Sequence, residues 1–303
     1  MYRMKNKPVT KAVIAAAGFG TRFLPQTKAM PKEMLPLIDK PIIQYIVEDL
    51  VAAGIKDIII VGSSNKRSIE DHFDMPNEDL LANLRAGGPK KQPFIDTIEA
   101  VSELANFVYI RQKGPYGTAT PIMNAAHLIG DEPFIYAFAD DITVGEPNSF
   151  QQMVSSYEKY GSSIVPCMRV REDDDFTKYG IIAGDAVADD AVKTTGIIEK
   201  PGKQNAPSDF AAVGGYLLKP EIFEYLHSGL ENLPQDKEFY VTDSLIEPML
   251  KEGHLFYGCE IKGIRYDTGD KLEYLKTVID FGLAHEELGQ PLRKHLEKRL
   301  KQR

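Results

Sequence analysis

Residues 11–36 read KAVIAAAGFGTRFLPQTKAMPKEMLP, an apolar run that passes directly into a turn rich in glycine, proline and positive charge. Gly18 and Gly20 can adopt positive φ values that point successive backbone N–H groups at one spot, and without a Cβ they let a phosphate approach the backbone. The cations that follow are Arg22, Lys28 and Lys32. A surface loop with solvated lysines would explain one cation but not the glycines, prolines and cations together. The stretch therefore predicts a binding site for a polyanion such as a nucleoside triphosphate.

Two familiar phosphate-binding loops fit this stretch poorly. A Walker loop ends in Gly-Lys-Ser/Thr, and the dinucleotide fingerprint G-x-G-x-x-G opens a helix, whereas here the third glycine is missing and a proline follows. A Rossmann-type oxidoreductase also needs an acidic residue closing its second strand, where this chain reads Val61-Gly62-Ser63. The loop is therefore of another kind.

The stretch resembles the signature of the sugar-1-phosphate nucleotidyltransferases, G-x-G-T-R-x-x-P followed by P-K-x-x-L-P. Residues 27–45, TKAMPKEMLPLIDKPIIQY, resemble in particular the bacterial UTP:glucose-1-phosphate uridylyltransferases, also called UDP-glucose pyrophosphorylases. The resemblance extends from Lys11 to about Leu296. It implies that the nucleotide is bound or oriented by the first motif, at Ala17, Gly18, Gly20, Thr21 and Glu33, the last of which orients either the nucleotide or Lys32.

A second motif, Gln112-Lys-Gly-Pro-Tyr-Gly117, follows the expected strand Phe107–Arg111. An amide offers a donor and an acceptor together, which suits the imide edge of a pyrimidine, and glycine lets the backbone pass close to a flat base. The resemblance assigns pyrimidine recognition to Gln112 and Gly117, although an exposed amide at a strand end is the simpler alternative. The loop then continues Thr-Ala-Thr-Pro121 where the uridylyltransferases usually read L-G-H-A, which leaves the choice between UTP and dTTP open.

A third motif is acidic. Asp140 and Asp141 follow the strand Phe134–Phe138, and Asp267 stands just before a helix. Two hard carboxylate ligands, completed by phosphate oxygens and water, are what Mg²⁺ typically uses. The resemblance makes Asp140 and Asp267 that pair. As simpler alternatives, Asp141 would cap a turn, and Asp270 would cap the helix that starts at Lys271.

A fourth motif, Glu199-Lys200-Pro201, ends another strand. A carboxylate can accept hydrogen bonds from two sugar hydroxyls, and an adjacent lysine can hold a phosphate as a point charge. The resemblance makes Glu199 the reader of glucose and Lys200 the holder of its phosphate, with an exposed ion pair as the alternative. It places Gly180, Val213 and Gly214 around the sugar.

Alternating apolar strands and helices predict an α/β fold with a Rossmann-like, mixed and mostly parallel sheet flanked by helices. Buried strands are expected at 13–17, 57–62, 107–111 and 133–138, and helices at 42–53 and 121–129. Asp39 is the expected cap of the first helix, with Pro41 in its first turn. Further strands are expected at 163–168, 179–183, 195–198 and 212–218, and helices at 271–287 and 291–301.

We expect a single domain over residues 1–303, built from a nucleotide-binding half, a sugar-binding half and terminal helices. These parts span about 9–161, about 162–270 and 271–303, with a helical insertion at 65–105 that contains a flexible loop at 86–93. The basic tail after Arg293 is expected to be a solvated face.

Composition agrees with an enzyme of the cytoplasm. The chain has 303 residues, of which 43% are hydrophobic, so it can bury a large core. A net charge of -8 disfavours a nucleic-acid partner. No apolar run is long enough for a membrane span, and the first residues lack the hydrophobic region of a signal peptide. Cys167 and Cys259 are expected to be reduced, structural thiols.

Taken together, the motifs predict nucleotidyl transfer from UTP to α-D-glucose 1-phosphate, giving UDP-glucose and pyrophosphate, with Mg²⁺ as cofactor. Arg22 is expected to contact pyrophosphate, Lys32 the triphosphate and Lys200 the sugar phosphate. A dTTP:glucose-1-phosphate thymidylyltransferase is the alternative within the class, and a non-catalytic sugar-nucleotide-binding protein the alternative outside it. We expect a homo-oligomer, either a dimer or a tetramer.

Overall fold

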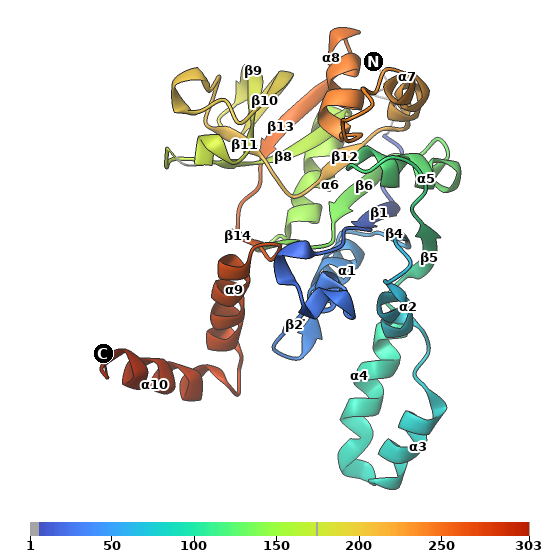
Figure 1. Cartoon of the computed structure of the whole chain (residues 1–303), viewed down its shortest axis with the longest axis vertical. Coiled ribbons are helices and arrows are strands. Elements are labelled where there is room, and N and C mark those ends of the chain that lie inside the picture. The colour runs from blue at the N-terminus through green and yellow to red at the C-terminus, as the bar shows by residue number, and fades with distance from the viewer. Residues whose placement is uncertain (1–5, 174, 303) are drawn as a thin grey trace.

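The computed structural model describes residues 6–173 and 175–302 and contains a central mixed sheet with helices on both faces (Figure 1). In that described part the sheet has ten strands in the order β11-β9-β10-β13-β8-β12-β6-β1-β4-β5. Their bounds are β1 Lys11–Ala16, β4 Asp57–Gly62, β5 Asn106–Arg111, β6 Phe134–Phe138, β8 Ser163–Arg169, β9 Gly180–Ala188, β10 Ala191–Glu199, β11 Phe210–Ala212, β12 Tyr216–Leu218 and β13 Phe256–Glu260. The mixed α/β fold class is confirmed.

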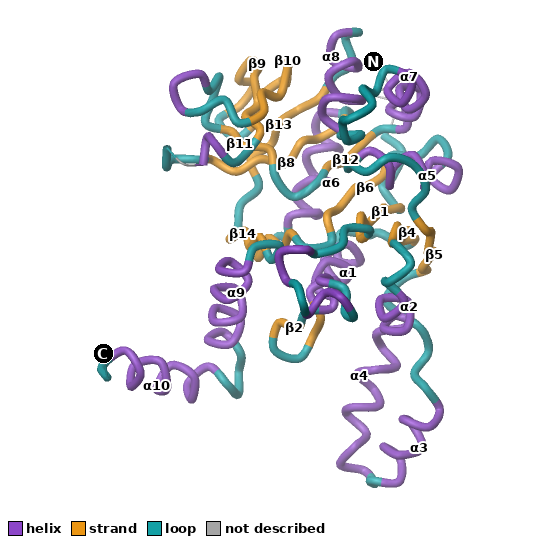
Figure 2. Tube along the Cα trace, viewed as in Figure 1, coloured by secondary structure: helices purple, strands orange, loops and turns teal. Residues whose placement is uncertain are grey.

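Parallel pairing is concentrated in the first half of the chain. Strands β6, β1, β4 and β5 run parallel to one another, as does the pair β8 and β13. The strands of the second half otherwise pair antiparallel. Two short ribbons lie outside the main sheet: β2 (Pro36–Leu37) with β3 (Lys40–Pro41), and β7 (Asp141–Val144) with β14 (Ile264–Asp267). Figure 2 shows the strands of the main sheet crossing the body of the protein, with β14 and β2 apart from them.

Strand alternation explains the layers. On one face of the sheet Ile14 and Ile58 join the core that includes buried residues of α1 and α6. On the other face Val13, Ile59 and Val61 join the core of α5. Because successive side chains of a strand point to opposite faces, a continuous apolar run such as β4 is what a strand covered on both sides requires.

The helices span α1 Ile42–Ala52, α2 Arg67–Phe73, α3 Glu78–Ala86, α4 Gln92–Ser102, α5 Ala119–Ile129, α6 Ser149–Tyr160, α7 Leu226–Glu231, α8 Glu247–Lys251, α9 Lys271–Ala284 and α10 Gly289–Leu300. The predicted insertion is the α2–α4 region, whose α3–α4 hairpin projects from the sheet (Figure 1). Helices α9 and α10 also extend away from the sheet, separately from the α3–α4 hairpin (Figure 1). None of the helices in residues 6–173 and 175–302 has the length and apolar character needed to cross a bilayer.

Two local expectations were wrong. Asp39 does not cap α1, because Lys40 and Pro41 pair with β2 and the helix begins at Ile42 without a side-chain cap. The expected strand at 212–218 is divided into β11 and β12 by two glycines with positive φ. The expected loop at 86–93 coincides largely with the turn between α3 and α4, which includes a 3-10 turn at Pro89–Lys91, and its flexibility stays a prediction. The two cysteines are free and buried, as predicted.

Candidate active site

The site begins at the edge where the four parallel strands of the first half end. Ala16 of β1 is in register with Gly62 of β4, and Gly62 with Arg111 of β5. On the other side of β1, Ala15 pairs with Phe138 of β6. The segments that follow these strands therefore emerge together, although they are far apart in the sequence.

The glycine loop follows β1 and turns sharply. Gly20 lies in the left-handed region with a φ of 64°, and its carbonyl accepts a hydrogen bond from the Thr27 hydroxyl at 2.7 Å. A Cβ at Gly20 would lie 3.1 Å from both Lys32 Cβ and Thr27 Cγ2. Glycine is therefore required here for both conformation and space. Thr21 and Arg22 form the helical turn that comes next.

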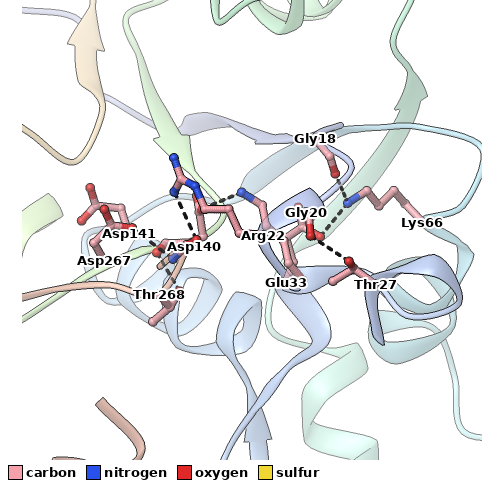
Figure 3. Close-up of polar contacts among 12 residues, drawn as sticks. Gly18, Gly20, Arg22, Thr27, Glu33, Lys66, Asp140, Asp141, Asp267 and Thr268 are labelled. Carbon is pink, nitrogen blue, oxygen red and sulfur yellow. Dashed lines mark hydrogen bonds and ion pairs between the residues drawn. The ribbon is translucent and has the colours of Figure 1, made fainter. Parts of the chain in front are cut away.

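Behind this loop lies a buried ion pair that the motifs did not reveal. Lys66 Nζ donates to Glu33 Oε2 at 2.8 Å and to the carbonyl of Gly18 at 2.7 Å (Figure 3). The side chains of Lys66 and Glu33 are 3% and 0% exposed. Burial raises the pKa of Glu33 and lowers the pKa of Lys66, and each partner opposes the shift of the other. In the sequence, Lys66 has the appearance of a surface lysine in a polar turn.

A cleft of about 550 Å³ opens over this edge of the sheet. It brings together predicted site residues from four separate segments: Ala17, Gly18, Lys32, Gln112, Gly117 and Asp140. Its lining also includes side chains that the motifs did not single out: Phe19, Tyr116, Phe138 and Glu238. Phe19 and Tyr116 meet edge to face at 6.2 Å between ring centroids.

Gly117 allows two backbones to approach each other beside this cleft. Its φ is +128°, and a Cβ there would collide with the backbone of Phe239. Phe239 N donates to the Tyr116 carbonyl at 2.7 Å, and Ala119 N donates to the Phe239 carbonyl at 2.8 Å. The buried Tyr136 hydroxyl donates to the Thr118 carbonyl at 2.6 Å. The loop that carries Gln112 and Gly117 is thus joined to a segment more than a hundred residues later in the chain.

The predicted metal ligands converge. A Cβ at Gly269 would lie 2.6 Å from Asp140 Oδ2 and 3.1 Å from Asp267 Oδ1, so both carboxylates face the same small space. Thr268 donates through N and Oγ1 to the Asp140 carbonyl, at 3.0 and 2.7 Å, and Gly269 N donates to Asp267 Oδ1 (Figure 3). In the described part of the chain no group of three or more such ligands could hold an ion alone. Two carboxylates fit an Mg²⁺ that takes its other ligands from phosphate and water.

Two cations line the approach to these carboxylates. Lys32 Nζ lies 2.5 Å from Asp140 Oδ2. Burial lowers the pKa of Lys32, but the carboxylates of Asp140, Glu33 and Asp267 together raise it above its ordinary value. Arg22 donates through Nη1 to the Gly269 carbonyl at 3.1 Å. The ammonium group of Lys32 beside Asp140 shows that this carboxylate attracts positive charge, as a ligand of a metal ion must.

Asp141 does not cap a turn, contrary to one expectation. It lies in β7 opposite Asp267, and its carboxylate accepts from Arg265 at 2.6 and 2.9 Å. Burial raises the pKa of Asp141 although Arg265 opposes the shift, and Arg265 also donates to the Tyr179 hydroxyl at 3.1 Å. Arg265 thus connects the carboxylate ribbon with the strand that begins at Gly180. Asp270 caps α9, as expected.

None of the residues expected to hold the sugar belongs to the lining of the cleft. Lys200 Nζ is 3.5 Å from Glu199 Oε1, and both side chains are more than half exposed. A Cβ at Gly180 would lie 3.1 Å from Glu199 Oε2, and the backbone N–H of Lys200 donates to the Tyr179 carbonyl.

A tyrosine connects this group with the cleft. Tyr216 stacks with Tyr136 and meets Phe138, both of which line the cleft, and the nearby Glu199 carboxylate contributes, after burial, to raising the Tyr216 pKa. Val213 lines another cavity, of about 380 Å³, whose lining also includes Arg169, Arg171 and Arg265. Gly214 is adjacent to it, with a φ of +73°.

Comparison with known proteins gives consistent results. The family described as Nucleotidyl transferase matches residues 11–280. The chain is 43% identical over 295 residues to the UTP–glucose-1-phosphate uridylyltransferase YngB of Bacillus subtilis (strain 168), covering 96% of each chain. It resembles a UTP-bound UGPase from Acinetobacter baumannii with a TM-score of 0.85 and 32% identity, covering 95% of this chain and 98% of that one. A UDP-glucose pyrophosphorylase complexed with UDP-glucose has a TM-score of 0.77 and 36% identity, over 90% and 98% of the chains.

Gly117→Ala tests how tightly the loop beside the cleft is packed. The alanine would have to adopt a strained φ, and its methyl group would have to separate two hydrogen-bonded backbones. We therefore expect the free energy of unfolding to fall by more than about 1 kcal/mol. Gly130→Ala is the matched control, since Gly130 has a φ of +68° and open space around its Cβ position. Urea unfolding would measure both, and equal losses would contradict the packing explanation.

Proposed function

Because the chain belongs to the nucleotidyl transferase family, we propose that it transfers the uridylyl group of UTP to α-D-glucose 1-phosphate, forming UDP-glucose and pyrophosphate. The observation that carries the proposal is the single cleft that joins the glycine loop, Gln112 and Asp140. The uridylyltransferase of Bacillus subtilis, which matches almost the entire chain, supports UTP as the nucleotide.

The reaction needs no nucleophile from the protein. An oxygen of the sugar phosphate attacks the α-phosphorus of UTP in line, a new phosphorus–oxygen bond forms, and the bond to the β,γ-pyrophosphate breaks. Both reactants are anionic, so the protein must hold them together and neutralise the charge that develops at the α-phosphorus.

The nucleotide side of the site lies on the glycine loop. Backbone N–H groups around Gly18 and Gly20 would bind phosphate oxygens, Lys32 would bind the triphosphate, and Arg22 would bind the departing pyrophosphate. Lys32 lies between the loop and Asp140, so its ammonium can contact a phosphate while remaining close to the carboxylate. Gln112 would pair with the uracil edge, with Gly117 beneath the ring.

Asp140 and Asp267 would hold Mg²⁺, which when bound supplies positive charge to the α-phosphoryl oxygens. Thr268 holds the backbone of Asp140 through its carbonyl, and Gly269 N donates to the Asp267 carboxylate. Within the ribbon of β7 and β14, which carries Asp267, Arg265 holds the Asp141 carboxylate.

The acceptor side lies around β9 and β10. Glu199 would accept hydrogen bonds from glucose hydroxyls, and Lys200 would hold the sugar phosphate. Gly180 lets Glu199 pack closely against the start of β9, where a Cβ would crowd its carboxylate. Val213 and Gly214 would complete the sugar site. A homo-oligomer and a cytoplasmic location remain predictions.

The substrate proposal is tested with a pyrophosphate-release assay that crosses UTP, dTTP, GTP, CTP and ATP with several hexose 1-phosphates. We expect the highest kcat/KM for UTP with α-D-glucose 1-phosphate. Purine nucleotides should fail, because the amide at Gln112 matches a pyrimidine edge. A methyl group is discriminated by only about 1 to 3 kcal/mol, so dTTP should retain partial activity. Higher activity with GTP or ATP would contradict the base assignment, and higher activity with dTTP would indicate a thymidylyltransferase.

Asp140→Asn tests the proposed metal site. The change removes a negative charge with little change in volume, so we expect a folded protein whose kcat falls by roughly a hundredfold or more. The matched control is Asp131→Asn, because Asp131 is an exposed residue paired with Lys7 far from the cleft. Steady-state kinetics over a range of Mg²⁺ concentrations would decide, and unchanged turnover would remove Asp140 from the site.

Lys200→Ala and Lys32→Ala test the two phosphate sites separately. Loss of a charge-assisted hydrogen bond is worth about 1.5 to 3 kcal/mol, so each change should weaken its own substrate by at least about tenfold. Lys200→Ala should raise the KM for glucose 1-phosphate and leave UTP binding intact, whereas Lys32→Ala should weaken UTP. Lys203→Ala is the control on the acceptor side, since Lys203 pairs with Asp173 at the surface. Calorimetric titration of UTP and kinetics in both substrates would measure these effects, and the opposite pattern would exchange the two assignments.

A further inference from the structure

The buried pair of Lys66 and Glu33 also contacts the glycine loop, and charge pairing alone does not explain that contact. Lys66 lies in the turn after β4, and its side chain runs back under the glycine loop (Figure 3). A Cβ at Gly62 would lie 3.2 Å from Lys66 Cβ, so the glycine at the end of β4 lets this side chain pass close to the strand. At its tip Lys66 joins two other segments, through Glu33 and through the Gly18 carbonyl.

We propose that Lys66, held by Glu33, is a positioning residue that sets the orientation of the Gly18–Phe19 peptide for binding the triphosphate of UTP. The inference rests on the proposed function. Because a peptide unit is planar and trans, fixing the Gly18 carbonyl toward Lys66 also fixes the N–H of Phe19 in roughly the opposite direction. Phe19 lines the cleft, whereas Lys66 does not.

The pair is poorly suited to a role in stability alone. Both side chains are almost completely removed from water, and Glu33 Oε1 is buried without a hydrogen-bond partner in the part of the chain that the structure describes. Burying two charges and leaving one oxygen unsatisfied costs stability, and apolar residues of similar size often serve as well or better. What apolar residues cannot replace is a donor at the Gly18 carbonyl.

The position of Glu33 distinguishes it from a residue that contacts nucleotide. Glu33 is fully buried and faces Lys66, while its neighbour Lys32 faces Asp140 at the cleft. The two adjacent residues thus have different tasks. Lys32 presents a charge to the ligand, and Glu33 holds the lysine that fixes the loop.

The test compares Lys66→Met with the double variant Lys66→Met/Glu33→Leu, using the complete chain. The single variant leaves Glu33 charged and unpaired, so it should lose stability as well as UTP affinity. The double variant buries no unpaired charge and should recover most of that stability, yet the Gly18 carbonyl still lacks its donor. We expect the double variant to bind UTP at least about tenfold more weakly by calorimetry, with the KM for glucose 1-phosphate changed less than about twofold.

Lys11→Met is the matched control. Lys11 lies at the opposite end of β1, where its Nζ pairs with Glu132 at 2.8 Å and also donates to the carbonyls of Leu128 and Ile129. It therefore makes the same kinds of contact away from the cleft. We expect Lys11→Met to affect stability without changing the UTP dissociation constant.

Three outcomes would overturn the proposal. A stable double variant with unchanged UTP affinity would make the pair a structural element only, and so would a double variant that does not fold. An equal loss of UTP affinity in Lys11→Met would show that the effect is not specific to the loop. Failure of the wild-type protein to bind UTP would instead contradict the proposed function, so the two failures are distinguishable.

Discussion

The whole site depends on the constraint that strands running parallel in one sheet end at the same edge. Strands β6, β1, β4 and β5 are adjacent and parallel, so the segments after them emerge side by side. Those segments contain, in turn, Asp140, the glycine loop, Lys66 and Gln112. The groups proposed to bind a base, a phosphate chain and a metal ion therefore meet in one cleft, because the backbone hydrogen bonds of the sheet align their starting points.

Charge is the second organising principle of this edge. Three cations near this edge, the proposed phosphate ligands Lys32 and Arg22 and the positioning residue Lys66, each have a partner within the protein. Lys32 faces Asp140, Lys66 faces Glu33, and Arg22 donates to the Gly269 carbonyl. Such pairing holds the cations in place before a ligand arrives, and it reduces the reorganisation that binding would otherwise require.

Local patterns were sufficient to predict most of the elements. The strand β4 and the helix α5 were recognised within two residues, because a buried strand and a buried helix differ in periodicity and in their flanking residues. The cap at Asp39 was wrong because a short β-ribbon outside the helix occupies Lys40 and Pro41. The alternative of a turn cap at Asp141 was wrong because the partner of Asp141, Arg265, is 124 residues away. Local sequence contains no information about such a partner.

For the site, the sequence by itself determined the chemistry. The glycines, cations, amide and carboxylates were visible as motifs, because residue type and spacing along the chain determine which groups are available. The tertiary structure alone decided which of these groups meet and what supports them. It placed Asp140 beside Asp267 and brought the loop at Gly117 against Phe239. It also buried Lys66, which the sequence shows only as a lysine in a polar turn, against Glu33. Contacts of this kind depend on where folding brings distant segments together, and burial then determines whether a charge is solvated or must find a partner.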